Sequence, residues 1–407
     1  MPNKLTNQPI ATNLMSYSLY LHIPFCTHRC GYCDFNTYAG LESLMPAYVE
    51  ALLAEIYSSS SSVGERLPVH TIFFGGGTPS LLYVDDVEKI LNALRVAYRV
   101  SEDAEITLEA NPGTLSAEKL VGLRKVGVNR LSFGVQSASP EELRLLERQH
   151  DFRDVIQAVK WARVARFDIL NLDWIYGLPG QSLESWRKNI ELAVKLNPEH
   201  LSLYSLSIEH GTPFKEMSSR GLLPLIDSDL AADMYDWASD RLEAAGYQQY
   251  EISNWAKTDS DGKLLTCRHN LQYWRSLPYL GLGAGAHGFA GGLRTVNVLA
   301  PAVYMRRLKA GGDFEFPRTP ATASMEEIEP RRLMGEHMMM GLRLVREGVA
   351  RLAFAEKFGR DLGNVYGPQI ERLHSLGLLE SVSGNQNAIR LTKKGRLLGN
   401  QVFIEFI

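Results

Sequence analysis

Cysteine is scarce in this chain, with 4 residues among 407, and three of the four lie close together. A disulfide-stabilised extracellular domain uses more cysteines in a shorter chain, so that class of protein is excluded. The chain is long enough to bury a hydrophobic core without such cross-links. Clustered cysteines in an intracellular protein indicate metal or redox chemistry instead.

Long apolar segments are also absent. The longest runs, 201–206 and 280–286, are much shorter than the ~20 residues that a membrane-spanning helix needs. Residues 1–18 are polar, with one lysine and no arginine, which disfavours a secretory signal or a transit peptide. We therefore expect a cytoplasmic protein without a transmembrane segment, one that reaches a membrane only peripherally through a partner.

Neither sign of charge dominates the composition. The chain has 43 Lys and Arg residues against 46 Asp and Glu residues, a formal net charge of −3. Surfaces that bind nucleic acid or anionic lipid need clustered positive charge. We therefore expect no nucleic-acid partner.

Short β-branched or aromatic segments alternate with segments of helical periodicity over the first two thirds of the chain. Six of them predict strands, at 18–23, 71–74, 105–109, 130–134, 169–176 and 201–207. This alternation predicts an α/β fold with a parallel sheet and right-handed crossovers. Glycines and polar residues at the strand ends favour a partial (β/α)6 TIM-like barrel over a flat, doubly wound sheet.

The pattern changes after about residue 254. We divide the chain into an N-terminal tail (1–16), a barrel (17–255), a connecting segment (256–315) and a C-terminal domain (316–407). In the last domain, a helix is expected over 325–345, followed by a second helix and a short hairpin. That order predicts an α+β, winged-helix-like domain.

Cys26, Cys30 and Cys33 form a Cys-x3-Cys-x2-Cys motif directly after the first predicted strand. A structural zinc site usually has four ligands, so His22 or His28 would have to complete one here. Thiolates are the usual ligands of iron–sulfur clusters, and three would leave one iron of a [4Fe–4S] cluster without a protein ligand. We favour the cluster, because that iron is open to a small molecule.

The segment 22–35 resembles the signature of the radical S-adenosylmethionine (SAM) superfamily. The resemblance implies that the open iron chelates the amino and carboxylate groups of SAM. It also implies that one electron from the cluster splits SAM into methionine and a 5′-deoxyadenosyl radical. In such proteins the cofactor supplies the chemistry, and the protein positions and shields it.

Further motifs follow the later strands: Phe-Gly-Gly-Gly-Thr-Pro-Ser, Glu-Ala-Asn-Pro-Gly, Arg-Leu-Ser-Phe-Gly-Val-Gln-Ser and Ile-Tyr-Gly-Leu-Pro-Gly-Gln. Together with His-Ile-Pro-Phe-Cys, they resemble the oxygen-independent coproporphyrinogen III oxidase family, from about residue 17 to the C-terminus. The resemblance implies that SAM is contacted by Tyr20, Gly76, Gly77, Thr78, Glu109, Gln136, Arg148 and Asp173, with Tyr32 beside the cluster.

This family contains a decarboxylase and a paralogous group of haem chaperones. The decarboxylase has a further cysteine two residues after the third cluster ligand, where this chain has Phe35. It also has a longer N-terminal extension, which covers its site and helps to hold a second SAM. Residues 267–274 read Cys-Arg-His-Asn-Leu-Gln-Tyr-Trp and resemble the His-Asn-x-x-Tyr-Trp motif associated with haem binding in the chaperone group.

That motif makes His269 the candidate axial ligand of haem, because imidazole commonly binds haem iron. Tyr273 and Trp274 can pack on a porphyrin face. Cys267 is a second candidate, through its thiolate. The alternatives are a histidine that only forms hydrogen bonds within its loop and a cysteine that acts as a small buried residue.

The resemblance favours a haem chaperone that binds haem, a [4Fe–4S] cluster and SAM, and delivers haem to an apo-haemoprotein client such as a respiratory enzyme. The cluster would then serve assembly or dimerisation, so a homodimer is one expected form. The alternative is an oxygen-independent coproporphyrinogen III oxidase, which decarboxylates propionate side chains and needs an electron acceptor and a shielded radical. A radical enzyme for another substrate is a third reading. The sequence leaves open whether SAM is cleaved or only bound, and so whether the chain is an enzyme.

Overall fold

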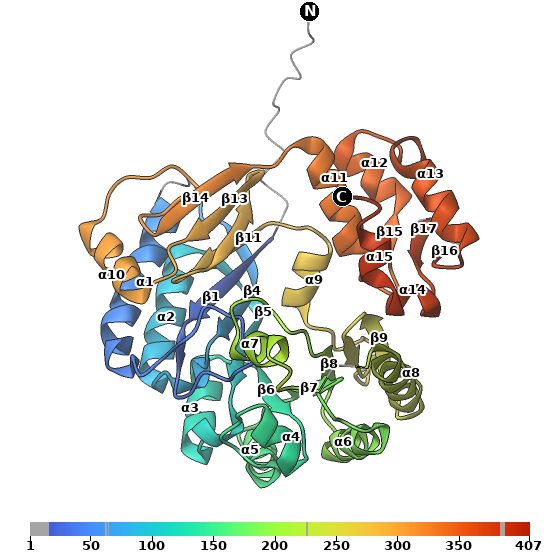
Figure 1. The fold of residues 1–407 in the computed structure, drawn as a ribbon. Helices are drawn as coiled ribbons and strands as arrows, with labels where there is room; N and C mark the ends of the chain where they lie inside the picture. Colours follow the sequence, from blue (N-terminus) through green and yellow to red (C-terminus); the bar gives the residue numbers. More distant parts are fainter. Residues whose placement is uncertain (1–15, 62, 64, 225–226, 383–386) are drawn as a thin grey trace, which may run out of the picture.

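Residues 16–61, 63, 65–224, 227–382 and 387–407 are described by a computed structural model (Figure 1). The expected N-terminal tail lies outside these residues, apart from Ser16. Six parallel strands follow one another across the main sheet in chain order. They are β1 (Tyr17–Ile23), β4 (Pro68–Gly76), β5 (Arg99–Ala110), β6 (Arg130–Gln136), β7 (Ile169–Tyr176) and β8 (His200–Ser205). A doubly wound sheet would reverse its strand order at a switch point. The order found here confirms the partial barrel.

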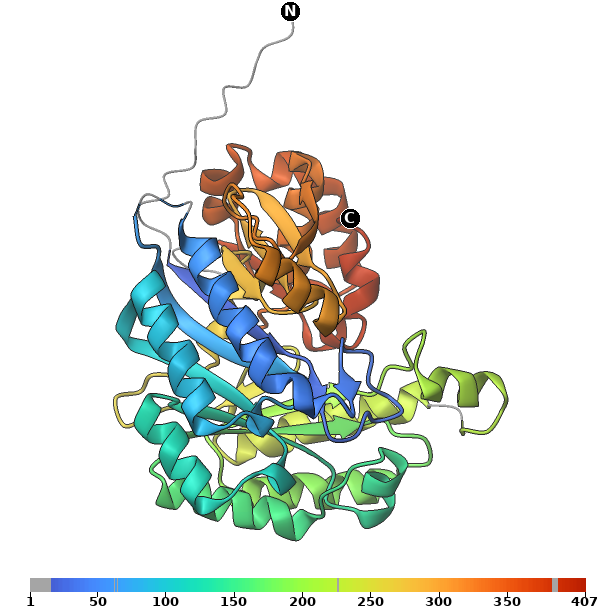
Figure 2. The same ribbon diagram turned by 90° about the vertical axis from the view of Figure 1, so that its left-hand side faces the viewer.

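Helices cover the outer face of this barrel (Figures 1 and 2). Four of them begin at polar caps formed by Ser or Asp side chains. The Ser116 side chain accepts a hydrogen bond from the Lys119 amide at 3.2 Å, and Asp151 forms a capping box with Asp154. The helices are α1 (Met45–Ser61), α2 (Val84–Ala97), α3 (Ala117–Val126), α4 (Pro140–Leu145), α5 (Phe152–Val164) and α6 (Leu183–Leu196).

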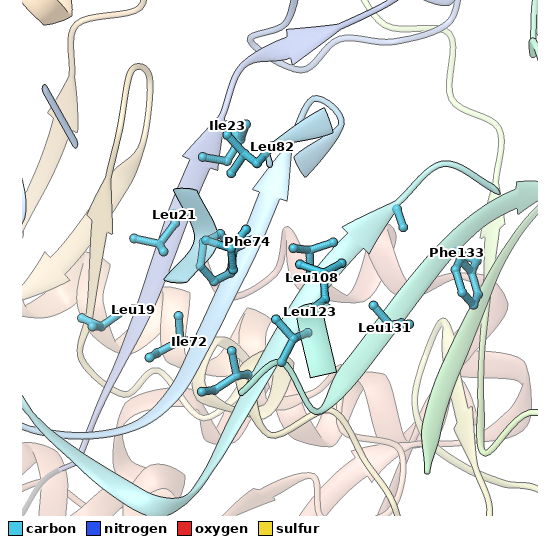
Figure 3. Close-up of a cluster of buried hydrophobic side chains, with 14 of the residues drawn as sticks. Leu19, Leu21, Ile23, Ile72, Phe74, Leu82, Leu108, Leu123, Leu131 and Phe133 are labelled. Atoms are coloured by element: carbon cyan, nitrogen blue, oxygen red, sulfur yellow. The ribbon is translucent and has the colours of Figure 1, made fainter. Parts of the chain in front are cut away.

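The hydrophobic core lies between the strands and these helices. Figure 3 shows strand residues that point to one side of the sheet, among them Leu19, Leu21, Phe74 and Leu108, each with 0% of its surface exposed. Alternate residues of a strand face opposite sides, so the intervening residues point into the barrel. This alternation is why the polar side chains of the same strands gather in the barrel interior.

The sheet continues beyond the six strands at both edges. β11 (Tyr279–Leu282) pairs in parallel with β1, and β12 (His287–Ala290), β13 (Leu293–Asn297) and β14 (Thr322–Glu327) follow in antiparallel order. At the other edge, β10 (Asn254–Ala256) and β9 (Gln248–Glu251) extend β8. The linking helices are α7 (Pro213–Ser219), α8 (Ser228–Ala244), α9 (Arg268–Trp274) and α10 (Pro301–Ala310).

The C-terminal domain has its own hydrophobic core, which includes Met338, Phe354 and Tyr366. Its helices surround a small sheet in the order β15-β17-β16, in agreement with the expected winged-helix-like domain. The elements are α11 (Pro330–Gly341), β15 (Val349–Ala350), α12 (Arg351–Phe358), α13 (Leu362–Ser375), β16 (Leu379–Val382), β17 (Ala388–Leu391), α14 (Lys393–Leu397) and α15 (Gly399–Phe403).

The predicted helix over 325–345 is wrong at its start. Met325 lies in β14, an edge strand paired with β13, and the helix begins only at Pro330. Proline is favoured in the first turn of a helix, whereas β14 is almost entirely exposed and shows no apolar alternation. Main-chain pairing alone forms this strand, so side-chain periodicity could not reveal it. No helix in the described ranges is long and apolar enough to cross a membrane.

Candidate functional site

The three clustered cysteines line one cavity at the C-terminal ends of the barrel strands. The cavity has a volume of about 460 Å³. Its wall combines the cysteine loop with residues from the ends of β4 to β8. The two flanks of the loop are joined by two short elements, β2 (Phe25–Cys26) and β3 (Tyr38–Ala39), which pair in parallel. The barrel therefore gathers at one edge the residues that are far apart in the sequence.

Each thiol has at least one polar neighbour, and the Cys30 thiol also donates to the Glu147 carbonyl at 3.9 Å. Thr78 donates to the Cys26 sulfur at 3.6 Å, Arg148 Nη1 lies 4.0 Å from the Cys30 sulfur, and the Cys33 sulfur lies 4.0 Å from Thr37 Oγ1. Burial raises the pKa of the Cys26 and Cys30 thiols, whereas the Arg148 guanidinium acts in the opposite direction. Donors near sulfur stabilise thiolates, the form in which cysteine binds iron.

Glu147 ties the cysteine loop to the barrel. Its carboxylate accepts hydrogen bonds from the Gly31 amide at 3.1 Å and from His28 Nε2 at 3.0 Å. The residue has a φ of 53°, in the left-handed region that is unusual for non-glycine residues. Glu147 belongs to none of the sequence motifs, because its role depends on a contact between distant segments.

The histidines proposed for a zinc site are engaged elsewhere. His22 Nε2 donates to the Asn36 carbonyl at 2.9 Å, so His22 Nδ1 accepts from the Tyr20 hydroxyl at 3.0 Å. His28 bonds to Glu147. Among the described residues, no three Cys, His, Asp or Glu side chains converge closely enough to hold a single metal ion. Thiols spread around one cavity suit a cluster, whose ligands bind different iron atoms.

The glycine motif after β4 brings backbone close to the cysteine loop. The Gly77 amide donates to the Ile23 carbonyl at 2.8 Å, and a Cβ on Gly77 would lie 2.6 Å from the Phe25 carbonyl oxygen. No side chain fits there, because the two nearest atoms, the Phe25 and Ile23 carbonyl oxygens, belong to the backbone and cannot turn away. Gly77, the last glycine of the motif, is therefore required by packing as well as by any ligand.

We expect Gly77→Ala to destabilise the protein by about 1–3 kcal/mol, because the backbone of the cysteine loop must move. Urea unfolding measures this. Gly113→Ala is the matched control, since a Cβ there would meet nothing closer than 3.7 Å. Equal stability of the two variants would contradict the close approach.

Two half-buried carboxyl groups lie near each other in the barrel interior. Glu109, at the end of β5, accepts a hydrogen bond from the Gly76 amide at 3.1 Å. Asp173, in β7, accepts from Ser132 and Asn171 at 2.8 Å each. Burial and, secondarily, the nearby Asp173 raise the pKa of Glu109 to about 8. Burial also raises the pKa of Asp173, so the pair resists carrying two negative charges without a ligand.

The cavity wall contains polar atoms that no protein group satisfies. Gln136 Oε1 and Arg148 Nε are buried and have no hydrogen-bond partner, while Arg148 Nη2 donates to the Gly134 carbonyl at 2.8 Å. Gln136 follows an irregularity in β6 and has a φ of 65°. Unsatisfied buried polar atoms are uncommon and indicate a missing partner. The donor and acceptor set therefore fits a polar ligand such as SAM beside an iron–sulfur cluster.

Most of the residues expected around the cluster and SAM line this cavity, and Tyr20 is placed differently. The lining set contains Cys26, Cys30, Tyr32, Cys33, Gly76, Gly77, Thr78, Glu109, Gln136, Arg148 and Asp173. The Tyr20 ring lies behind the glycine motif, 2.9 Å from where a Cβ on Gly75 would be. Its position supports the wall rather than forming it.

The residues expected to bind haem lie on α9, away from the cysteine loop. His269 is 1% exposed and stacks on Phe73 with a centroid distance of 5.0 Å. Its Nδ1 lies 2.8 Å from Thr71 Oγ1, and its Nε2 lies 2.8 Å from the Tyr273 hydroxyl. Burial lowers the pKa of His269 to about 3, so the ring is neutral at physiological pH. Both ring nitrogens are engaged in this conformation.

A smaller cavity of about 100 Å³ connects these two regions of the barrel. Glu109, Ser132, Asp173 and Tyr204 line both cavities, and the smaller one extends to Cys267 and Asn270 at the start of α9. Cys267 is 3% exposed, and burial chiefly raises the pKa of its thiol to about 12. In this conformation Cys267 is a protonated thiol.

A buried ion pair at the start of α9 was missed by the sequence analysis. Glu105 accepts hydrogen bonds from the amides of Arg268 and His269 at 3.1 and 3.0 Å, and lies 3.5 Å from Arg130 Nη1. A carboxylate at a helix N-terminus satisfies amides that lack helical partners. The available signal was the alternation of β5, which places Glu105 on the same face as Glu109.

Comparisons with known proteins agree with these features. Residues 20–193 match the radical SAM superfamily model, and residues 328–398 match the HemN C-terminal domain model. The heme chaperone HemW of Bacillus subtilis (strain 168) is 40% identical over 96% of this chain and 99% of its own length. HemW of Escherichia coli (strain K12) is 38% identical over 96% and 98%.

One solved structure resembles the whole chain. Coproporphyrinogen III oxidase (HemN) from Escherichia coli, described as a radical SAM enzyme, aligns with a TM-score of 0.79 and 24% identity. The alignment covers 96% of this chain and 90% of that one. At this identity the likeness establishes a shared fold.

Proposed function

The chain belongs to the HemW family of heme chaperones in the radical SAM superfamily, and from that premise we propose that it binds haem and delivers it to an apo-haemoprotein. The observation that carries the proposal is the extent of the similarity, which spans almost the whole length of both this chain and the relatives. The barrel and the C-terminal domain are thus both included. The client itself is an apo-protein that lacks haem, such as a respiratory enzyme.

We further propose that Cys26, Cys30 and Cys33 hold a [4Fe–4S] cluster and that the surrounding wall holds SAM. A cluster and SAM together supply one-electron chemistry. The protein's part is to bind and orient the two groups. The Gly76–Thr78 backbone and the unsatisfied Gln136 and Arg148 atoms support SAM contacts in the larger cavity.

The proposed haem contacts are His269, Tyr273 and Trp274. A neutral imidazole is the form that binds haem iron, and the low pKa of His269 keeps it in that form. Its Nε2 must first leave the Tyr273 hydroxyl. Cys267 is the second candidate, but its raised pKa opposes the thiolate that ligation needs.

Titration of the anaerobically reconstituted protein with hemin, followed by the Soret band, tests this function. We expect near-stoichiometric binding by wild type and at least tenfold weaker binding by His269→Ala, because an axial ligand is lost. His210→Ala, at an exposed histidine, is the matched control and should bind as wild type.

Two other outcomes of the hemin titration would change the proposal. Tight binding that is indifferent to His269 would move the ligand, with Cys267→Ala as the next variant. An absence of specific binding would overturn the chaperone proposal. Decarboxylation of coproporphyrinogen III by the reconstituted protein would then decide for the oxidase.

A further inference from the structure

The helix that carries the proposed haem residues is enclosed on two sides. α9 lies between the main sheet and the C-terminal domain (Figure 1). On the sheet side, Thr71 Oγ1 lies 2.5 Å from Ser18 Oγ and donates to it, so His269 Nδ1 donates to Thr71. His269 Nε2 is then left to accept from the Tyr273 hydroxyl. The lone pair that would bind iron is therefore occupied by a residue of the same helix.

The start of α9 is anchored deep in the barrel. Glu105 holds the first amides of the helix and is itself paired with Arg130, which is 1% exposed. A buried pair of this kind is costly to break, because either charge alone would be left in an apolar setting. This end of the helix is the fixed end.

Leu271 of α9 shares a small apolar cluster with Leu344 of the C-terminal domain. Beyond it, charged side chains of that domain hold the end of α9 through three contacts, which we call the clasp. Arg275 forms a two-point ion pair with Glu347, at 3.1 and 2.7 Å. The Arg343 guanidinium lies 5.0 Å from the centre of the Trp274 ring, and Lys357 Nζ donates to the Ser276 carbonyl at 2.8 Å. Trp274 Nε1 has no hydrogen-bond partner, so the Arg343 guanidinium is the polar group that holds this ring.

The clasp is much weaker than the anchor. The side chains of Arg275 and Glu347 are 44% and 49% exposed, and an exposed ion pair contributes little to stability. Tyr273 sits between the two ends and packs edge-on against Tyr279 at 4.6 Å. Gln272 is 1% exposed and its side chain donates to the Ser16 and Pro278 carbonyls, so it stays fixed with the start of the helix. Release of the clasp would free residues 273–276 and let the Tyr273 hydroxyl move away from His269.

We propose that the C-terminal domain gates haem access to His269 by holding the end of α9 closed through the clasp. This inference rests on the proposed function, because it concerns access to the same haem site. It makes Glu347 and Lys357 positioning residues for haem loading, although neither touches the proposed ligand. A client that displaced the clasp would open the site for transfer.

The test uses the full-length protein with Glu347→Gln, the double variant Glu347→Gln/Lys357→Met, and Asp240→Asn as control. Asp240 pairs with Lys393 at 2.8 Å, so its replacement weakens another contact between the barrel and the C-terminal domain without touching α9. Two readouts are measured. These are amide hydrogen exchange in 273–276 and the rate of hemin association followed by the Soret band.

We expect the rate of hemin association to rise roughly two- to fivefold in Glu347→Gln and roughly tenfold in the double variant, with faster exchange in 273–276. The control should match wild type in both readouts. Faster exchange without faster association would overturn the gate and leave the chaperone proposal standing. Equal acceleration in Asp240→Asn would also overturn it, since general loosening would suffice. Wild type that binds no hemin would instead overturn the proposed function itself.

Discussion

A variant with alanine at positions 26, 30 and 33 is expected to lose the brown iron–sulfur absorbance entirely after anaerobic reconstitution. The physical reason is that these three thiols line one cavity, where Thr78 donates to the Cys26 sulfur and the Arg148 guanidinium lies beside the Cys30 sulfur. Among the described residues, the remaining cysteine, Cys267, is buried at the start of α9 and bonded to Glu105. It cannot substitute for them.

Iron and acid-labile sulfide content, measured together with the visible spectrum, check this prediction. Cys267→Ala is the matched control, because it removes a cysteine of the same chain and should keep a full cluster. Circular dichroism of each apo-protein shows whether the fold survives, since loss of the cluster through unfolding would prove nothing about ligation. A folded triple variant that still holds iron and sulfide would contradict the assignment.

The barrel was predictable from the sequence because its strands and helices have different hydrophobic periodicities. Segments of β-branched residues and helical patterns alternate in order, and each places its apolar residues on one face. The edge strands were not predictable in the same way. β14 is exposed along its length and forms only because its backbone pairs with β13. β11 lies in a glycine-rich segment and is defined by its parallel partner, β1.

The candidate site was predictable wherever a motif occupies the end of one strand. The cysteine loop, the glycine motif, Glu109 and Asp173 all belong to such motifs, and the barrel brings them to one cavity. Contacts between distant segments could not be predicted. The Glu147 tether and the Glu105–Arg130 pair each join parts of the chain that no local pattern relates. The enclosed position of His269 is of the same kind, because its hydrogen-bond partner Thr71 lies 198 positions away in the sequence.

The second large effect concerns Glu109, whose replacement is expected to move stability and SAM affinity in opposite directions. Its pKa rises from 4.5 to about 8 in the folded protein. Between these values the folded state holds a proton that the unfolded state has lost, so wild-type stability falls as pH rises through this window. The slope attributable to Glu109 is about 1.4 kcal/mol per pH unit at most. Glu109→Gln keeps the neutral form at every pH and should remove that slope.

At about pH 8 we therefore expect Glu109→Gln to be more stable than wild type towards urea, and about equally stable near pH 5. Its affinity for SAM should fall about tenfold or more, because in the proposed site the carboxylate would accept a hydrogen bond from SAM and attract its positive charge, and a hydrogen bond to a charged group contributes about 1.5–3 kcal/mol. Glu88→Gln, at an exposed carboxylate, should change neither property. If Glu109 served only in packing, its replacement would lower the stability of the protein. A gain in stability combined with weaker SAM binding indicates a carboxylate that destabilises the fold but contributes to SAM binding. Unchanged SAM affinity would remove Glu109 from the SAM site.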